Sequence, residues 1–174
     1  MALPAAERFE IVDADDRVVG VAARGACHGN PALVHRTAHV VVWSRAGRLL
    51  LQKRSAGKDI QPGRWDTAVG GHLHVGESYE QAARREMAEE IGIAADLPLR
   101  HLFDTRLRND LESENVRVFG LVHEGPFRPQ AGEVDEVRFW SVDEVAAALG
   151  TGVFTPNLEA EFAELQRRGL RPGR

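Results

Sequence analysis

The chain has 174 residues, which is enough for one well-buried domain and short for two. Its 43% hydrophobic and 28% charged content is ordinary for a globular protein, and a net charge of −4 gives no general reason to expect nucleic-acid binding. Cys27 is the only cysteine, so an internal disulfide is excluded, and no run approaches the roughly 18 apolar residues of a membrane helix. We therefore expect a cytoplasmic protein without a membrane segment or a nucleic-acid partner.

The first part of the chain alternates short apolar runs with turn-forming residues, a pattern typical of β-strands. The predicted strands cover residues 8–12, 17–23, 35–44, 49–54 and 65–69. We expect a turn at Gly70 and Gly71, directly after the last of these strands. The N-terminal strand pair, residues 8–23, could support a homodimer.

Two capping boxes predict where helices begin in the second part of the chain. Ser78 with Gln81 opens a helix that is expected to reach about Ile91, and Ser141 with Glu144 opens a short helix. Further strands are predicted at residues 99–106, 116–123 and 136–140, and a last helix at about 157–168. The whole pattern indicates an α/β protein of the α+β type, with residues 1–174 in a single domain.

The helix that follows Ser78 carries a cluster of acidic residues. Glu86, Glu89 and Glu90 are spaced i, i+3 and i+4, so their carboxylates share one face. Like charges at this spacing cost a helix roughly 0.2–0.5 kcal/mol per pair. Two interpretations stay open: a solvated charged face, or a site for a hard divalent cation such as Mg²⁺ or Mn²⁺, which oxygen-rich clusters suit.

A wider spacing pattern surrounds this cluster. From Gly71, five residues lead to Glu77 and seven more to Arg85, and the chain continues as Glu86-Met87-Ala88-Glu89-Glu90-Ile91-Gly92-Ile93. Residues 71–93 resemble the complete signature of the Nudix hydrolase superfamily and match every fixed position. The resemblance implies a mixed β-sheet sandwiched between helices. It also implies hydrolysis of a diphosphate linkage in a nucleoside diphosphate derivative or related small molecule.

The same resemblance implies roles for the residues of the signature. It makes Glu86, Glu89 and Glu90 the catalytic and metal-binding carboxylates, with an oxygen of Gly71 as a further ligand to Mg²⁺ or Mn²⁺. Glu77 and Arg85 are then expected to hold the loop and the helix in position, because ligands must be oriented by their neighbours.

Residues outside the signature are candidates for the remaining roles. The general base is expected to be a helix glutamate or a loop residue such as Glu133 or Glu136. Lys53 and Arg54 are candidates to contact substrate phosphate oxygens, with exposed strand-end charges as the alternative. Trp65 and Phe154 are candidates to stack on a base or a prenyl chain, with burial in the core as the alternative.

Residues from Ile11 to Glu77 also resemble the isopentenyl-diphosphate isomerase branch of the superfamily, including the run LLLQKRS and Pro62–Trp65. Those isomerases use three histidines and two glutamates as metal ligands. The residues that match them in this chain are His28, His35, His72, Glu112 and Glu114. Imidazole and carboxylate ligands suit Zn²⁺, Mn²⁺ or Mg²⁺, so the resemblance implies a possible second divalent metal. Structural or exposed side chains are the alternative interpretation.

Two departures from the isomerase pattern argue against isomerisation. The essential cysteine of the isomerases would lie near Gly70, whereas Cys27 is distant in sequence. Their second acid/base residue has no equivalent among Leu102, Phe103 and Asp104. Because allylic isomerisation needs a proton donor and an acceptor, hydrolysis is favoured. A non-catalytic binding module is the third hypothesis.

The sequence does not identify the substrate. We expect selectivity to come from the loops around the acidic helix, at residues 55–64, 108–115 and 150–157. The remaining histidines match neither pattern, and we expect them to serve packing or to face solvent: His39, His74, His101 and His123.

Overall fold

The computed structural model describes residues 7–173. Its strands are β1 (Arg8–Val12), β2 (Val18–Ala23), β3 (Val34–Trp43), β4 (Leu49–Arg54), β5 (Trp65–Thr67), β6 (Val69–His72), β7 (Arg100–Arg108), β8 (Ser113–Val122) and β9 (Val134–Trp140). Its helices are α1 (Arg24–Cys27), α2 (Tyr79–Ile91), α3 (Val142–Ala148) and α4 (Pro156–Arg167). None of the helices within the described residues is long and apolar enough to cross a membrane.

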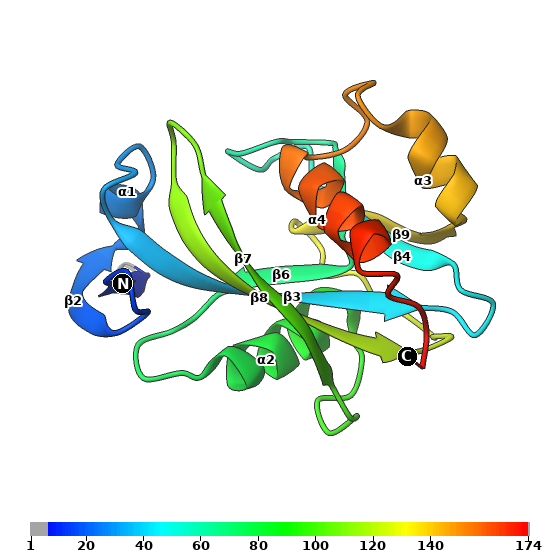
Figure 1. The fold of residues 1–174 in the computed structure, drawn as a ribbon, viewed down its shortest axis with the longest axis horizontal. Helices are drawn as coiled ribbons and strands as arrows, with labels where there is room; N and C mark the ends of the chain where they lie inside the picture. Colours follow the sequence, from blue (N-terminus) through cyan, green and yellow to red (C-terminus); the bar gives the residue numbers. More distant parts are fainter. Residues whose placement is uncertain (1–6, 174) are drawn as a thin grey trace.

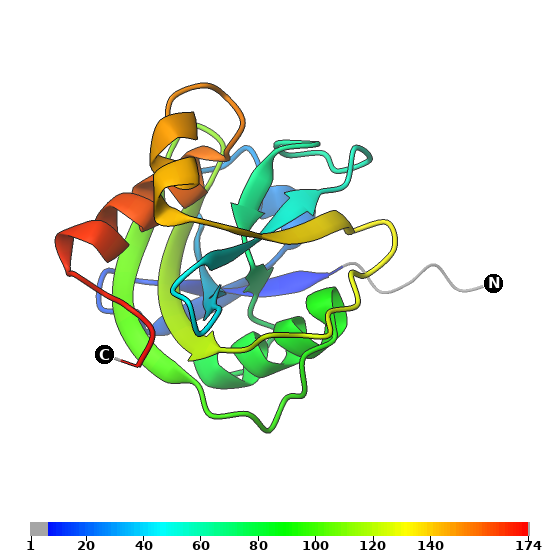
Figure 2. The same cartoon turned by 90° about the vertical axis from the view of Figure 1, so that its right-hand side faces the viewer.

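The principal sheet has seven strands and mixed directions. Its main path runs β5-β4-β3-β8-β7, while β6 also pairs with β3 and β9 with β4. The β3–β8 pair is parallel, whereas β8 and β7 are antiparallel. Helix α2 covers one side of this sheet, and α4 lies on the other (Figures 1 and 2). The predicted fold class, a mixed sheet between helices, is therefore confirmed.

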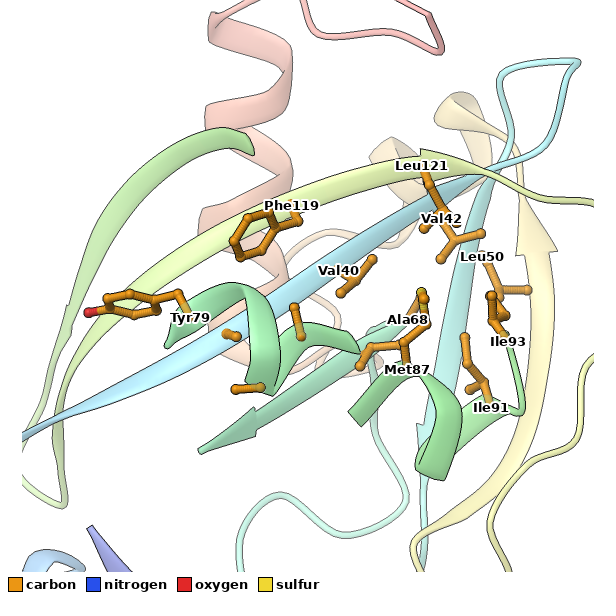
Figure 3. Close-up of a cluster of buried hydrophobic side chains, with 14 of the residues drawn as sticks. Val40, Val42, Leu50, Ala68, Tyr79, Met87, Ile91, Ile93, Phe119 and Leu121 are labelled. Atoms are coloured by element: carbon orange, nitrogen blue, oxygen red, sulfur yellow. The ribbon is translucent and has the colours of Figure 1, made fainter. Parts of the chain in front are cut away.

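Strand β3 shows how the sequence supplies both faces of the sheet. Side chains alternate between the two faces of a strand. Val40 and Val42 accordingly enter the apolar cluster beneath α2, which also contains Met87 (Figure 3). Val41 and Trp43 enter the opposite cluster, with the apolar residues of α4. Because both faces are covered, the end of β3 is a continuous apolar run.

Helix α2 begins and ends as its sequence predicts. Ser78 accepts a hydrogen bond from the backbone of Gln81, whose side chain accepts one in return, and Gly92 closes the helix with a φ of 69°. The same helix buries Ala83, Met87 and Ile91, which recur every four residues and form an apolar stripe. The acidic residues therefore have a fixed orientation relative to the core.

The predicted turn at Gly70 and Gly71 is wrong, because both glycines lie within β6 and pair with β3. A Cβ at Gly70 would lie 3.1 Å from the ring of His39, and one at Gly71 would overlap the carboxyl group of Glu86. Glycine avoids both contacts, because side chains from other elements lie close to this part of β6. The close approach of these side chains, and not a turn, accounts for the two adjacent glycines.

Two further boundaries differ from the prediction. Residues 24–27 form the short helix α1, which the sequence pattern did not predict. Strand β8 begins at Ser113, so Glu114 lies inside a strand and pairs with His35 of β3. Propensity alone disfavours glutamate in a strand, and the partner on the neighbouring strand explains its position.

Candidate active site

Glu90 is buried at the inner side of α2. Its Oε2 accepts hydrogen bonds from Gln52 Nε2 and from the backbone N–H of Gly70, both at 3.1 Å. Burial, with the nearby charge of Glu86, raises the pKa of Glu90 to about 8, despite these two bonds. A nearby cation would favour the ionised form of this carboxyl group.

Arg85 connects α2 to the segment that follows β6. Its Nε and Nη2 donate to the two carboxylate oxygens of Glu77 at 2.8 and 2.9 Å, and Nη2 also donates to the carbonyl of His72 at 3.1 Å. Its Nη1 lies 2.6 Å from Glu86 and 3.4 Å from Glu89. Such a paired guanidinium–carboxylate geometry fixes orientation as well as distance.

The three helix carboxylates do not converge as a group within 4.8 Å in the described part of the chain. Arg85 draws the side chains of Glu86 and Glu89 towards itself, while Glu90 turns inward. Glu86 nevertheless lies directly over the backbone of Gly71, and burial raises the pKa of its carboxyl group. Carboxylate and carbonyl oxygens are the ligands that Mg²⁺ and Mn²⁺ prefer, so this donor set fits such an ion.

A second cluster contains all five residues that match the isomerase ligands. His72 Nε2 lies 3.0 Å and His35 Nε2 lies 3.4 Å from the same oxygen of Glu114. His28 Nε2 lies 3.9 Å from a Glu112 oxygen. The three histidines form one group, and His35 with the two glutamates forms another, with ligand atoms within 4.8 Å of one another in each. Strands β3, β6 and β8 bring together residues that are far apart in sequence.

The surroundings of this cluster fit a bound divalent metal. His35 donates from Nδ1 to the carbonyl of Leu33 at 3.2 Å, which directs its Nε2 into the cluster. Within the described residues, the Nε2 atoms of His28 and His35 are buried without a hydrogen-bond partner. Phe9 of β1 stacks on the rings of His35 and His72, with centroids 5.1 and 4.3 Å apart. Orphaned, oriented imidazole nitrogens are suitable metal ligands.

The charges in the second cluster compensate one another. Burial alone would raise the pKa of Glu114, but the adjacent His35 and His72 outweigh it and hold that pKa well below its usual range. Burial and the charge of Glu114 raise the pKa of Glu112. The cluster thus resembles a site in which a metal and protons compete for the same ligands.

A cavity of about 510 Å³ lies beside both groups of residues. It is lined by His28, His72, Glu112 and Glu114 and by Gln52, Gly70 and Gly71. The α2 glutamates do not line it themselves, but Glu90 is bonded to Gln52 and Gly70, and Glu86 lies over Gly71. Arg54 also lines the cavity, and its guanidinium is held by the carbonyl of Ile60 at 3.0 and 3.1 Å and by Asp66 at 3.3 Å. The volume is suitable for a small-molecule ligand.

The other predicted residues lie away from this cavity. Lys53 falls between Gln52 and Arg54 on β4 and does not line it, as alternation along a strand requires. Glu133 is ion-paired with Lys58, and Glu136 is exposed on β9. Trp65 packs edge-to-face on Trp140 at 5.2 Å, and Phe154 is 1% exposed in the core. The alternative of core packing therefore holds for Phe154.

Sequence reasoning missed a buried pair at the cavity. His39 Nδ1 lies 2.8 Å from Glu161 Oε2, and the expectation that His39 only packs or meets solvent does not describe this contact. A signal for the pair was present in α4. Glu161 lies within the apolar stripe of Leu158, Phe162 and Leu165, and a carboxylate at a core position predicts a buried partner.

The fold, the complete signature around α2 and the adjoining cavity define a pyrophosphohydrolase of the Nudix type, an enzyme that acts on acid anhydrides. The family model described as the NUDIX domain matches residues 33–158, and the chain belongs to this family.

Individual relatives agree with this assignment. The chain is 34% identical over 173 residues to an uncharacterised Nudix hydrolase, YfcD of Escherichia coli (strain K12), with 97% of this chain and 92% of the relative covered. It is 35% identical over 152 residues to an isopentenyl-diphosphate Delta-isomerase of Burkholderia multivorans, covering 81% and 86% of the two chains. The crystal structure of DR0079 from Deinococcus radiodurans superimposes with a TM-score of 0.78 at 25% identity, covering 91% and 98%.

Proposed function

We propose that this protein hydrolyses a diphosphate linkage in a nucleoside diphosphate derivative or a related small molecule, using Mg²⁺ or Mn²⁺. The observation that carries the proposal is the buried carboxyl group of Glu90, held next to Gly70 and the cavity within a complete Nudix signature. A buried acid with a pKa of about 8 destabilises the ionised protein unless a cation compensates it. A catalytic metal site explains why the chain carries this group.

Glu86, Glu89, Glu90 and an oxygen of Gly71 are the proposed ligands of the catalytic ion. When bound, Mg²⁺ neutralises charge on the diphosphate and lowers the pKa of a coordinated water. The chain positions its own groups: Gln52 and the Gly70 N–H orient Glu90, while Arg85 and Glu77 hold the start of the helix. Arg54 is the proposed phosphate contact from β4, because it lines the cavity and Lys53 does not.

The general base is proposed to be one of the helix glutamates. Glu133 is ion-paired with Lys58, and Glu136 is exposed on β9. Glu89 is the most exposed of the three helix glutamates considered, with its side chain 51% accessible, so water can reach it. A base must lie within hydrogen-bond reach of the attacking water. The exposure of Glu89 and the bonds of Glu90 to Gln52 and Gly70, which line the cavity, support a residue of α2.

The second cluster is proposed to bind a further divalent metal through His28, His35, His72, Glu112 and Glu114. Two buried, unpartnered imidazole nitrogens and two carboxyl groups support this proposal. Its position beside the same cavity would let the ion interact with the second phosphate of the substrate. Metal titration followed by elemental analysis would test it, since a protein with one ion per chain at saturation contradicts a second site.

Hydrolysis can be tested with a panel of nucleoside diphosphate derivatives in the presence of Mg²⁺ or Mn²⁺. The proposal predicts release of a monophosphate or phosphate by the natural protein and its near-absence in E89Q and E90Q. E80Q is the matched control, because Glu80 lies on the same helix but pairs with Arg84 at the surface. If the natural protein cleaves no member of the panel faster than E90Q does, the proposal is wrong.

An isomerase is the second candidate, since a relative named isopentenyl-diphosphate Delta-isomerase is 35% identical and the five matching ligands assemble here. The structure offers a reason against it. Position 70 carries glycine and no thiol, and a Cβ there would lie only 3.1 Å from the His39 ring. Incorporation of solvent deuterium into isopentenyl diphosphate would favour the isomerase, and an inert result would remove it.

A cytoplasmic location and a homodimer complete the proposal. Cys27 is the only cysteine of the chain and is buried and unbonded, which suits a reducing compartment. On the outer strand β2, Val18, Val19 and Val21 are between 41% and 65% exposed, a surface that a second copy could cover. Light scattering tests the dimer, since a monomeric mass at micromolar concentration would exclude it.

A further inference from the structure

His39 and Glu161 form a buried pair that the proposed hydrolysis does not yet use. His39 lies on β3 and Glu161 on α4, and the two residues are only 8% and 5% exposed. Their Nδ1 and Oε2 atoms lie 2.8 Å apart. Removing two ionisable groups from water is costly, so a pair of this kind needs an explanation.

The ring of His39 contributes to this pair and also to the wall of the cavity. His39 lines the cavity, next to Gly70, Gly71 and Thr37. A Cβ at Gly70 would lie 3.2 Å from Nε2 of His39, so the glycine leaves room for the nitrogen that faces away from Glu161. Within residues 7–173, no hydrogen bond involves this Nε2 atom. The pair therefore presents one imidazole nitrogen at the cavity.

Thr37 supplies a second, independent observation at the same place. It precedes His39 by two residues on β3, so the two side chains share one face of the strand. Thr37 is 4% exposed and lines the cavity, yet its hydroxyl has no partner in the described part of the chain. Buried hydroxyl groups are normally hydrogen-bonded, which points to a polar ligand here.

The charges around His39 make its free nitrogen a donor. Burial opposes protonation, but the hydrogen bond and charge of Glu161, with Asp66 of β5 and Glu114 of β8, raise the pKa of His39 to about 9. The protonated ring, which these charges favour, carries a proton on Nε2 as well as on Nδ1. An anion entering a cavity lined by several carboxylates is stabilised by such a donor.

A purely structural role does not account for these features. A tether between α4 and the sheet needs only the bond between His39 and Glu161. It does not require Gly70 to leave room beside the opposite nitrogen, nor an unpartnered Thr37 hydroxyl next to it. Both features are expected where a ligand oxygen completes the hydrogen bonds.

We propose that His39, oriented by Glu161, donates a hydrogen bond from Nε2 to a non-bridging oxygen of the diphosphate, and that the Thr37 hydroxyl binds the same phosphate group. His39 is thus a substrate-binding residue, and Glu161 is a positioning residue that acts through it. This inference rests on the proposed function for the identity of the ligand as a diphosphate. It adds a fixed protein cation to the charge that the metals supply, and it places the diphosphate against Gly70.

Methylenebisphosphonate, a diphosphate analogue that resists hydrolysis, is the probe. Its affinity is measured by calorimetry in saturating Mg²⁺ for the natural protein and for H39Q, E161Q and T37V. We expect H39Q to weaken binding by about 10- to 100-fold, because a charge-assisted hydrogen bond is lost. H101Q is the matched control and should bind as the natural protein does, since His101 forms an exposed pair with Asp104 at 2.9 Å.

A second readout separates substrate binding from a structural tether. In the natural protein, the ¹⁵N resonance of His39 Nε2 should shift when the bisphosphonate is added, and the shift should diminish in E161Q. A tether predicts no shift. If H39Q fails to fold, two measurements still test the role of His39: the bisphosphonate affinity of T37V and the His39 resonance of the natural protein. Neither measurement removes the buried pair.

Failure of this inference is distinguishable from failure of the proposed function. Equal bisphosphonate affinity in folded H39Q and in the natural protein, or an unmoved His39 resonance at saturation, would overturn the role of His39 even if hydrolysis occurs. His39-dependent binding without cleavage of any substrate would support the role of His39 and contradict hydrolysis alone.

Discussion

The buried carboxyl groups of the α2 cluster and of the second cluster have opposite electrostatic surroundings. On α2, Glu90 receives two neutral hydrogen bonds, and burial raises its pKa to about 8. Between β3, β6 and β8, Glu114 is even more enclosed, but His35 and His72 hold its pKa well below the usual range. The first carboxyl group receives its hydrogen bonds from neutral donors and feels the charge of Lys58 only as a minor effect, whereas the second has two adjacent histidines.

This difference suggests a division of labour between the clusters. The buried carboxyl group on α2 gains most from a hard cation, which suits a catalytic ion that bridges protein and phosphate oxygens. In the second cluster His35 and His72 already lie against Glu114, and a metal there must compete with protons for the ring of His35. We therefore expect the first site to control turnover and the second to modulate it.

The largest expected effect is the loss of turnover in E90Q. Removing the buried carboxylate should lower kcat by at least about 100-fold, because the catalytic ion loses a ligand. Steady-state kinetics at saturating Mg²⁺ measures this change. E80Q, altered at the surface of the same helix, should retain normal turnover. A turnover in E90Q within a few-fold of the natural protein would contradict the role assigned to Glu90.

The same substitution should stabilise the metal-free protein. The folded state of the natural protein holds the Glu90 proton up to about pH 8, whereas an ordinary glutamate releases it near pH 4.5, so stability should fall as the pH rises through that interval. Glutamine cannot ionise, so E90Q avoids this loss. Its free energy of unfolding at pH 8 should exceed that of the natural protein by roughly 1–4 kcal/mol. Urea unfolding in EDTA at several pH values tests this expectation, and E90Q that is less stable at pH 8 would contradict it.

Weakening the second cluster should reduce metal binding more than it reduces turnover. E114Q removes the charge shared by His35 and His72 and should lower the affinity for the second ion by about 10- to 100-fold. Titration of Mn²⁺ followed by electron paramagnetic resonance measures both sites in one experiment. E136Q, at an exposed position of β9, is the control. Unchanged binding of two ions by E114Q would show that the cluster is not a metal site.

The smallest effect is expected for R85K. Arg85 pairs with both oxygens of Glu77 and also reaches Glu86 and the His72 carbonyl. Lysine keeps the charge but cannot make all of these contacts at once. We expect kcat to fall by about 5- to 10-fold, with little change in the thermal midpoint. R84K is the control, because Arg84 pairs with Glu80 away from the cavity. Equal activity of R85K and R84K would show that charge alone is sufficient.

Much of the fold could be predicted because local patterns and tertiary structure agree. The capping box at Ser78, the C-cap at Gly92 and the apolar stripe through Met87 all indicate the same helix. The prediction failed at Gly70 and Gly71, since turn formation is the usual reason for two adjacent glycines. There the decisive factor is the space taken by His39 and Glu86, which come from other elements.

The candidate site was predictable only where a spacing pattern exists. The α2 carboxylates and the five residues of the second cluster could be named from their positions, because a resemblance supplied the pattern. Glu161 lies in the apolar stripe of α4, which signals a buried partner. That partner, His39, is 122 positions away, so only the packing of α4 on β3 identifies it. Likewise, the burial of Phe154 depends on Trp140, whose ring lies 5.2 Å away.

A crystal structure of the protein soaked with Mn²⁺ and methylenebisphosphonate, with anomalous diffraction data, tests the central claim most directly. The account predicts an anomalous peak within bonding distance of Glu86, Glu89 or Glu90, with bisphosphonate oxygens completing its coordination. Manganese bound only among His28, His35, His72, Glu112 and Glu114, with the α2 glutamates still on Arg85 and Gln52, would contradict it.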